Sequence, residues 1–430
     1  MRKPCFSETF GSGLPRKLLV ILAAFLLASC GFWEPHSAIL RTDRPEFAIY
    51  AEYFNSSQDE YRIETRYTAS LTQGLAGAGD SPDIVVGSWL KSASTRSLFR
   101  PLDYLLKKEI NGDAFYSRLL SLGKIDEKQY LLPVAFNIPA LAFSGSNSSL
   151  LPGLFVISPG EIKETGRAYN RESGGAFTQM GFSPSWNEEF IFVTATLFNT
   201  GFREAEPLDW DHQALEESIR YIYAWINDAN TNNANANNAN MENDFAFKYF
   251  FIPQPKLAIS GRVLFCYLES SEFFTLAGEQ QDSLDFRWIA GNDGTIPLVE
   301  NTTYYGISRT TRAKKAADAF TLWFFREDTQ RLLLEESKRR RMNETLFGIG
   351  GGFSAMRTVT EQVFPRYYPG LLGHMPPEAA LSPPNILPHN WMAIKRQVIL
   401  PYLHDRIRSG NGAADLDRRL ADWFRINRDQ

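Results

Sequence analysis

Strand-like segments alternate with helix-like segments along most of this chain. The continuously apolar run at residues 83–87 is typical of a strand that is buried on both faces of a parallel sheet. We also expect strands at residues 46–51, 61–67 and 257–261. Helices are expected at residues 102–106, 115–120, 188–198 and 215–227. Strands that alternate with helices in this way indicate an α/β fold.

The chain is long enough for more than one folding unit. Its 430 residues exceed what one hydrophobic core usually organises, so two lobes are expected. The apolar segment 130–143 contains Pro133 and Pro139 and therefore cannot form one helix, which favours a crossing between the lobes. The formal net charge of -4 gives no reason to expect nucleic acid as a partner.

The N-terminal segment has the pattern of an export signal. Arg16 and Lys17 precede the short apolar stretch 18–27, which ends in Leu27-Ala28-Ser29-Cys30. This ending resembles the lipobox of bacterial lipoproteins, which implies a signal peptide at residues 1–29, lipidation of Cys30 and a tether at residues 30–44. The chain would then be anchored on the extracytoplasmic side of a membrane. An ordinary cleaved signal peptide and an uncleaved membrane anchor remain alternatives.

The sequence contains no recognisable catalytic or metal-binding motif. Once Cys5 is removed and Cys30 is lipidated, Cys266 is left alone, so no intrachain disulfide can form. Cys266 lies in an apolar run and is expected to be a buried small side chain. The five histidines show no metal-ligand spacing, and the glycines of residues 348–352 lack the lysine of a phosphate-binding loop. We therefore predict no catalytic residue, metal or cofactor, although two carboxylates facing each other, as in a glycosidase, remain an alternative.

One internal segment is of low complexity. Residues 227–243 are mostly Asn and Ala and offer little to bury, so we expect a surface insert. Binding of sugar by these asparagines is the alternative interpretation.

Several stretches resemble one known family. They are residues 81–87 before a tryptophan, the crossing segment 132–137, residues 256–261, and residues 305–308 ahead of the Ala-rich run 313–317. In this order they resemble the family 1 extracellular solute-binding proteins of ABC importers, the group that includes the maltodextrin-binding proteins. Trp391 begins a segment that looks like a late tryptophan helix of these proteins.

The resemblance implies a two-lobed, type II periplasmic-binding-protein-like α/β fold. Lobe 1 would comprise residues 45–135 and 288–325, and lobe 2 residues 137–286 and 326–430, with a hinge that includes residues 134–138. It also implies a monomeric, lipid-anchored substrate-binding component of an ABC importer that delivers a small solute, here a carbohydrate, to permease subunits. The alternative is a cell-envelope lipoprotein of the same fold that acts as a sensor, an adhesin or a receptor for a non-sugar solute.

Candidate ligand-binding residues follow from the chemistry of sugars, which present apolar C–H faces and a rim of hydroxyl groups. Aromatic and polar side chains at the carboxyl ends of expected strands, or at the starts of expected helices, suit such a ligand. These residues are Tyr53, Asn55, Trp89, Trp186, Arg262, Tyr304 and Trp391. Packing in the core or the hinge is the alternative role for each aromatic residue, and few acidic groups accompany Trp89, so the kind of sugar stays open.

Overall fold

The computed structural model describes residues 35–72, 75, 81–107, 109–227, 238–409 and 415–427. The predicted signal peptide, the predicted lipidation site Cys30 and residues 228–237 of the Asn-rich segment lie outside these residues.

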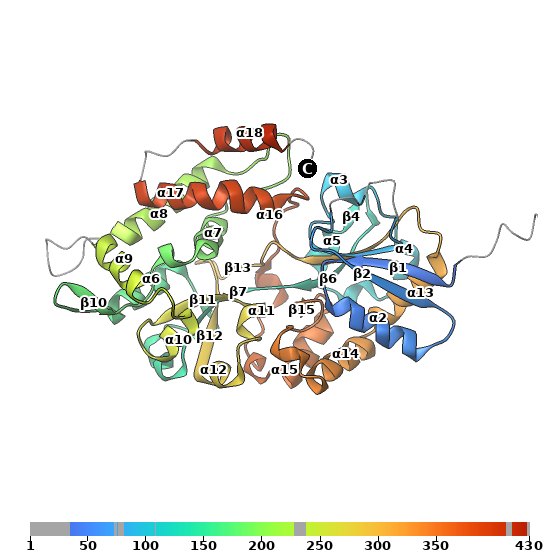
Figure 1. Cartoon of the computed structure of the whole chain (residues 1–430), viewed down its shortest axis with the longest axis horizontal. Coiled ribbons are helices and arrows are strands. Elements are labelled where there is room, and N and C mark those ends of the chain that lie inside the picture. The colour runs from blue at the N-terminus through green and yellow to red at the C-terminus, as the bar shows by residue number, and fades with distance from the viewer. Residues whose placement is uncertain are drawn as a thin grey trace, which may run out of the picture.

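The chain forms two lobes, each built on its own sheet (Figure 1). The first sheet has the strand order β15-β6-β14-β3-β1-β2 and the second has the order β11-β7-β12-β8. The strands of the first sheet are β1 (Ser37–Thr42), β2 (Arg62–Tyr67), β3 (Ile84–Gly87), β6 (Leu132–Phe136), β14 (Thr303–Ile307) and β15 (Phe353–Ser354). Those of the second are β7 (Pro139–Ser144), β8 (Val156–Ile157), β11 (Phe265–Glu269) and β12 (Leu284–Ile289).

Helices and short strand pairs surround the two sheets. The first lobe carries α2 (Glu46–Ser57), α3 (Ala93–Arg96), α4 (Asp103–Leu106), α5 (Ser117–Ser121), α13 (Lys314–Phe324), α14 (Glu327–Arg339) and α15 (Phe364–Tyr367). The second carries α6 (Pro159–Tyr169), α7 (Glu188–Leu197), α8 (His212–Asn227), α9 (Asn238–Lys248), α10 (Gln254–Ile259), α11 (Ser270–Phe273), α12 (Gly278–Ser283), α16 (Trp391–Ile394), α17 (Leu400–Ser409) and α18 (Leu416–Ile426). The short pairs are β4 (Lys124–Ile125) with β5 (Lys128–Gln129), β9 (Arg171–Ser173) with β10 (Ala176–Gln179), and β13 (Ile296–Pro297) with β16 (Leu381–Ser382).

The first strand lies earlier in the chain than the sequence predicted. Residues 46–51 belong to helix α2, and the strand is β1, which falls within the predicted tether. In α2 the residues Phe47, Tyr50, Ala51 and Phe54 are buried, and their spacing is helical. The apolar window 46–51 is too short to show this period, so the strand prediction there was wrong.

Two other strand predictions are confirmed. Residues 61–67 contain β2, which pairs in parallel with β1 along its whole length. Residues 83–87 contain β3, all four residues of which are buried. On its other side β3 pairs with β14, and this pair is antiparallel.

The chain crosses between the lobes three times. The first crossing is Asn137 and Ile138, which separate β6 of the first sheet from β7 of the second, within the predicted hinge. The second runs through residues 290–302, from β12 to β14. The third follows α15 and runs through residues 368–390 to the second lobe, where α17 packs against α7 and α8.

Two details of the predicted lobe boundaries need correction. Trp288 belongs to β12 and pairs with Ala140 of β7, so it lies in the second sheet and not in lobe 1. Helices α14 and α15 and strand β15 also belong to the first lobe, where β15 pairs with β6, although the sequence placed residues 326–430 in lobe 2. Both errors arise because short strands at a crossing carry no periodic signal of their own.

Candidate ligand-binding site

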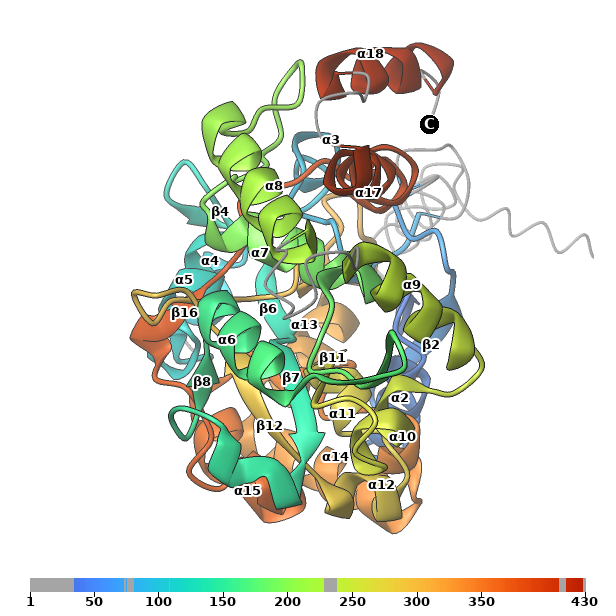
Figure 2. The same cartoon turned by 90° about the vertical axis from the view of Figure 1, so that its left-hand side faces the viewer.

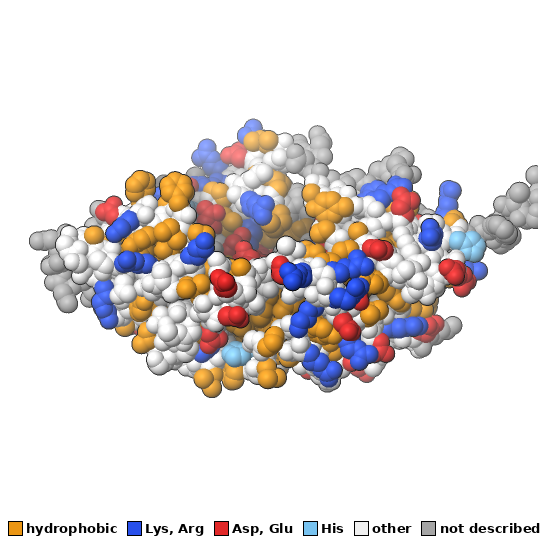
Figure 3. All heavy atoms as spheres, turned by 60° about the horizontal axis from the view of Figure 1, so that its bottom comes forward, with side chains coloured by type: hydrophobic (Ala, Val, Ile, Leu, Met, Phe, Trp, Pro, Cys, Tyr) orange, Lys and Arg blue, Asp and Glu red, His pale blue; other side chains and the backbone are white. Residues whose placement is uncertain are grey.

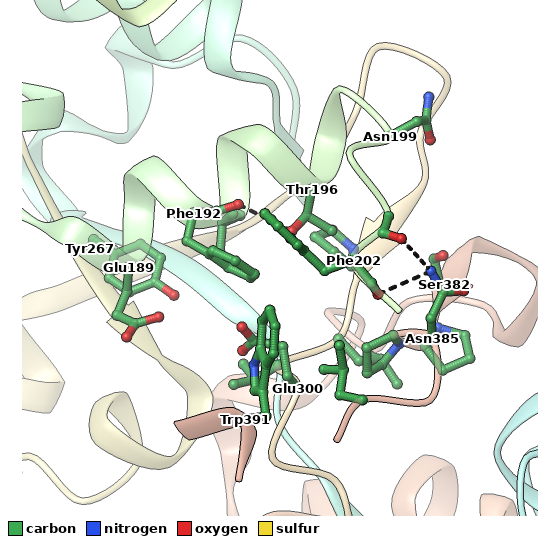
Figure 4. Close-up of a pocket in the computed structure, with 18 residues that line it drawn as sticks. Glu189, Phe192, Thr196, Asn199, Phe202, Tyr267, Glu300, Ser382, Asn385 and Trp391 are labelled. Carbon is green, nitrogen blue, oxygen red and sulfur yellow. Dashed lines mark hydrogen bonds between the residues drawn. The ribbon is translucent and has the colours of Figure 1, made fainter. Parts of the chain in front are cut away.

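A cavity lies where the second lobe meets two of the crossings (Figure 4). It encloses about 890 Å³ of space between atoms, open solvent included. Helix α7 forms one wall, residues 297–300 of the second crossing form another, and residues 382–387 of the third crossing close it. The remaining lining residues include Asn199, Phe202, Tyr267 and Trp391.

Aromatic rings form the middle of the cavity. The ring of Trp391 lies 5.5 Å from that of Phe202 and 6.1 Å from that of Phe192, measured between centroids. Trp391 has no exposed surface, and its indole Nε1 has no hydrogen-bond partner among the described residues. A buried indole N–H normally finds an acceptor, so this unpaired group is an exception among the described residues.

Polar groups occupy the two ends of the cavity. Figure 4 shows Glu189 and Tyr267 at one end, and Asn199 and Asn385 at the other. The Asn385 amide donates a hydrogen bond of 2.9 Å to the carbonyl oxygen of Gly201, which fixes the side chain at the cavity wall.

A buried lysine holds two carboxylates at this site. The Nζ atom of Lys395 lies 2.5 Å from Glu189 and 2.6 Å from Glu300. Burial opposes the charge of Lys395, but the two carboxylates outweigh it and raise the pKa of this ammonium group. Glu300 belongs to the second crossing and Glu189 to α7, so the lysine joins the crossing to the second lobe.

Glu269, at the end of β11, adds a further acidic group close to this pair. Burial raises its pKa to about 8, with further increases from the charges of Glu272, Glu300 and Glu189 and an opposing effect of Lys395. Its side chain accepts a hydrogen bond from the backbone N–H of Glu272, in a capping box at the start of α11. The group is therefore protonated in part near neutral pH and can then donate a hydrogen bond.

Hydrogen bonds connect the first crossing to both lobes. The Ser270 hydroxyl donates to the side-chain oxygen of Asn137 at 2.7 Å, and the Asn137 amide donates to the carbonyl oxygen of Gly351 at 2.9 Å. The backbone N–H of Val299 donates to the Asn137 carbonyl at 2.9 Å. Asn137 therefore contacts the second crossing and both lobes, which makes it the central polar residue of the hinge.

The first lobe contributes a charged group that the sequence analysis missed. Asp43 and Arg44 follow β1, and Arg44 donates hydrogen bonds to Ser88 at 2.7 Å and to the carbonyl oxygen of Asn301 at 3.2 Å. Burial raises the pKa of Asp43 against the opposing charge of Arg44. A Cβ atom at Gly87 would lie 2.2 Å from a methyl carbon of Leu71 and 2.5 Å from the Asp43 carboxylate, so glycine lets both side chains lie close to β3. The sequence analysis did not select Asp43 as a residue at the carboxyl end of a strand, because it placed β1 in the predicted tether.

Trp89 reaches from the first lobe to the second. It is partly buried against a hydrophobic cluster that includes Phe192, Phe202 and Trp391 of the second lobe. Its φ of 65° lies in the left-handed region, which is costly for a bulky residue and persists only where contacts hold it. Its predicted role in ligand binding stays a prediction, although the structure places it where the lobes meet.

Residues next to Trp89 make further contacts between the lobes. The backbone N–H of Ala93 donates to Glu204 at 2.8 Å, and the Ser94 hydroxyl lies 3.0 Å from Nδ1 of His389. The loop that follows β3 is therefore a second contact between the lobes, apart from the crossings.

Three predicted ligand residues are engaged in packing on the first lobe. Tyr53 and Asn55 lie on α2, not after a strand. The Tyr53 hydroxyl donates to Glu336 of α14, and the Asn55 side chain hydrogen-bonds both the N–H and the carbonyl of Ile63. Tyr304 is fully buried, and its hydroxyl donates to the Leu119 carbonyl at 2.8 Å. None of these three residues lines the cavity described above.

Arg262 and Trp186 lie elsewhere on the second lobe. Residues 254–259 form helix α10 and not the strand expected before Arg262, whose exposed guanidinium contacts only the Thr178 carbonyl, at 3.4 Å, among the contacts described. Trp186 stacks on Phe245 at 5.8 Å and lines a separate groove. Of the seven predicted residues, Trp391 is the one that lines the cavity at the crossings.

Comparisons with known proteins bear on the fold. No family model and no curated protein sequence matches this chain. Among solved structures, the maltose-binding periplasmic protein MalE from Listeria monocytogenes, in complex with maltose, aligns with a TM-score of 0.61 over 91% of this chain and 98% of that one, at 12% identity. The cyclic α-maltosyl-1,6-maltose binding protein from Arthrobacter globiformis aligns with a TM-score of 0.59 over 90% of this chain and 96% of that one, at 16% identity.

A third structure, CpMnBP1 with mannotriose bound, aligns with a TM-score of 0.58 over 90% of this chain and 98% of that one, at 14% identity. The chain has the two-lobed fold of periplasmic binding proteins. The fold expectation is therefore confirmed. In a two-lobed binding protein the ligand is held between lobes that close about a hinge, and the cavity adjoins the hinge segments of this chain.

The described residues show neither a metal site nor a membrane-spanning helix. They contain no group of three or more His, Cys, Asp or Glu side chains arranged to hold a metal ion. In the same part of the chain, no helix has the length and hydropathy needed to cross a membrane. Cys266 is buried, and burial raises the pKa of its thiol to about 12, so it is not an activated nucleophile.

Proposed function

We propose that this two-lobed binding protein is an extracytoplasmic solute receptor that takes a carbohydrate into the cavity at the crossings. The observation that carries the proposal is the composition of that cavity, in which aromatic rings lie between two polar ends. Aromatic faces pack against the C–H surfaces of a sugar ring, while carboxylates and amides at the ends bind its hydroxyl groups.

The similar structures support the same class of ligand. They are described with maltose, with mannotriose, and as a binding protein for a cyclic maltosyl-maltose. The role proposed here is binding without chemistry. Glu189 and Glu300 are both paired with Lys395, and these contacts suit them to hold hydroxyl groups in place.

The proposal includes membrane attachment and a transport partner. Lipidation of Cys30 would place the receptor at the membrane that holds the permease subunits of an ABC importer. Closure of the lobes around a ligand would then give the permease a shape to recognise. Cys30→Ala should release the protein from the membrane fraction, and retention of the variant there would contradict the anchor.

A thermal-shift and calorimetric screen tests the carbohydrate. Maltose, maltotriose, mannobiose and mannotriose are compared with a panel of amino acids, short peptides and polyols. A ligand present at about 100 times its dissociation constant should stabilise the protein by about 2.7 kcal/mol. A stabilising peptide or polyol, with no response to any sugar, would favour a receptor for a non-sugar solute.

Two neighbouring glutamates provide a matched pair of variants. Glu189 lines the cavity, whereas Glu188 is exposed in the first turn of the same helix and does not line it. Glu189→Gln should weaken sugar binding by about ten- to a hundredfold, because a hydrogen bond to a charged group contributes about 1.5–3 kcal/mol. Glu188→Gln should leave the affinity unchanged, and equal effects of both changes would place the ligand elsewhere.

A further inference from the structure

The turn between α9 and α10 exposes a group of apolar side chains. The exposed fractions are 84% for Phe247, 74% for Phe250, 93% for Phe251 and 43% for Ile252. We call these four residues the α9–α10 patch. None of them belongs to a hydrophobic cluster of the described residues, so the patch adds nothing to the core.

Hydrogen bonds and aromatic contacts hold the patch in place. The backbone N–H of Phe250 donates to the Phe247 carbonyl at 3.3 Å, and that of Ile252 donates to the Tyr249 carbonyl at 2.9 Å. The rings of Phe250 and Phe251 meet edge to face with centroids 5.2 Å apart. The apolar side chains are therefore presented to solvent by an ordered turn.

An aromatic layer supports the patch from the second lobe. The ring of Tyr249 lies 4.8 Å from that of Phe245, which stacks on Trp186 at 5.8 Å. These rings and those of Phe250 and Phe251 line one open groove. The patch therefore adjoins an aromatic layer that packs on the body of the lobe.

The patch and the start of the fold lie on the same side of the molecule. Figure 2 shows α9 and α10 on the same side as β2 and α2, and β1 pairs with β2. In Figure 1 the two regions lie at opposite ends of the long axis. Cys30 precedes the first described residue, Pro35, by a segment that can extend at most about 18 Å. A lipid on Cys30 would therefore hold the β1 end of the molecule close to the bilayer, and the patch lies at the other end on the same side.

The charges near the patch suit an anionic membrane surface. Lys248 and Lys256 are exposed on either side of the turn, and the Lys248 ammonium lies 5.3 Å from the Tyr249 ring centroid. Figure 3 shows exposed hydrophobic side chains next to Lys and Arg side chains on the surface. Aromatic rings together with lysines are favoured at the headgroup level of a bilayer, where the rings are buried and the ammonium groups meet anionic lipids.

We infer that the α9–α10 patch inserts into the headgroup region of the bilayer that anchors the chain. The receptor is then held at two points, by the lipid near β1 and by the aromatic turn at the other end of its long axis. The inference rests on the membrane attachment given under the proposed function. It does not depend on which solute is bound.

Vesicle sedimentation tests the patch without the lipid. The chain from Pro35 onward contains both sheets and their cores, so it is used without its anchor. Vesicles of phosphatidylcholine and phosphatidylglycerol should retain it, and the double change Phe250→Ser, Phe251→Ser should lower the partition coefficient by about tenfold or more. Leu372→Ser is the control, because Leu372 is 76% exposed and lies outside the patch.

Two further measurements distinguish insertion of the patch into lipid from other causes of reduced sedimentation. Phe251→Trp should add tryptophan fluorescence whose emission maximum shifts to shorter wavelength when vesicles are added. This substitution keeps an aromatic side chain in the patch. Light scattering in the absence of lipid detects association of the chain with itself. The inference is overturned if the double variant and the parent bind vesicles equally. It is also overturned if the parent forms a dimer that the double change abolishes, while neither protein binds vesicles. Sugar binding and release of Cys30→Ala are measured separately, so failure of the anchor or of the receptor role is distinguishable from failure of the patch.

Discussion

Lys395 joins the second crossing to the C-terminal helical region through its contact with Glu300, where Nζ lies 2.6 Å from the carboxylate. The lysine side chain is 3% exposed and also pairs with Glu189. Removing one member of a buried ion pair leaves an unpaired buried charge, which costs more than the pair itself contributes.

Lys395→Met should therefore destabilise the protein by about 3–5 kcal/mol. Urea unfolding at neutral pH measures the change. Adding Glu300→Gln to this variant should restore part of the loss, because it removes the buried charge that Lys395→Met leaves unpaired. No recovery in the double variant would show that the ion pair is not the cause.

Glu269 should make stability fall as the pH rises. Its pKa is 4.5 in the unfolded chain and about 8 when folded, chiefly through burial. Between these values the folded state keeps a proton that the unfolded chain has lost, so the free energy of unfolding decreases by at most about 1.4 kcal/mol per pH unit. Glu269→Gln cannot lose a proton and should remove this dependence. If the free energy of unfolding of this variant falls between about pH 5 and 8 as steeply as that of the parent, Glu269 is not the cause of the pH dependence.

Lys91 should produce the opposite trend at higher pH. Its Nζ is buried above the Tyr304 ring with no hydrogen-bond partner among the described residues, and burial lowers its pKa from 10.5 to about 7. Between these values the unfolded chain holds the proton that the folded state lacks, so stability rises with pH.

Lys91→Met should remove this second trend and raise stability at neutral pH and below, because it replaces a buried amine with an apolar side chain of similar length. Chemical unfolding at neutral and alkaline pH provides the comparison. A variant that is less stable than the parent at neutral pH would indicate a stabilising role for the ammonium group.

Trp89 should control how closely the lobes approach. Trp89→Ala removes the side chain that packs against the second lobe and leaves the first sheet intact. We expect a larger radius of gyration in small-angle scattering and a loss of stability of less than about 3 kcal/mol, below the range for truncating a core aromatic residue. Ser94→Ala, which removes a contact to His389 without changing the aromatic packing, is the milder control. A more compact Trp89→Ala variant would argue against this role.

Trp391→Ala should behave differently from Trp89→Ala. Trp391 has no exposed surface and packs against two phenylalanine rings, so its removal should cost about 3–5 kcal/mol. Trp391→Phe should retain most of the stability while removing the indole N–H that faces no partner. If this N–H binds a sugar hydroxyl, Trp391→Phe should weaken sugar binding with little change in the free energy of unfolding. Equal sugar affinity of the variant and the parent would assign Trp391 to packing alone.

Periodic segments of the sequence were sufficient to predict the class of fold. Buried β3 reads as a continuous apolar run, and α8 shows helical spacing over more than two turns. The first crossing was visible because two prolines interrupt an apolar segment. Short elements were not predictable in the same way: α2 was expected as a strand over its first half, and α10 was expected as a strand before Arg262.

The sequence by itself determined an α/β fold, because burial imposes a period on each long element, and a crossing within residues 130–143, because two prolines interrupt that apolar segment. Only the tertiary structure decided which polar residues meet. Lys395 pairs with Glu189 and Glu300, although the three residues lie far apart in the chain. This pairing depends on where the second crossing passes α7 and the C-terminal helices. The sequence proposed both Tyr304 and Trp391 as aromatic ligand residues. Tyr304 is buried in the core of the first lobe, whereas Trp391 lines the cavity. That difference arises from packing between distant segments, which no local pattern records.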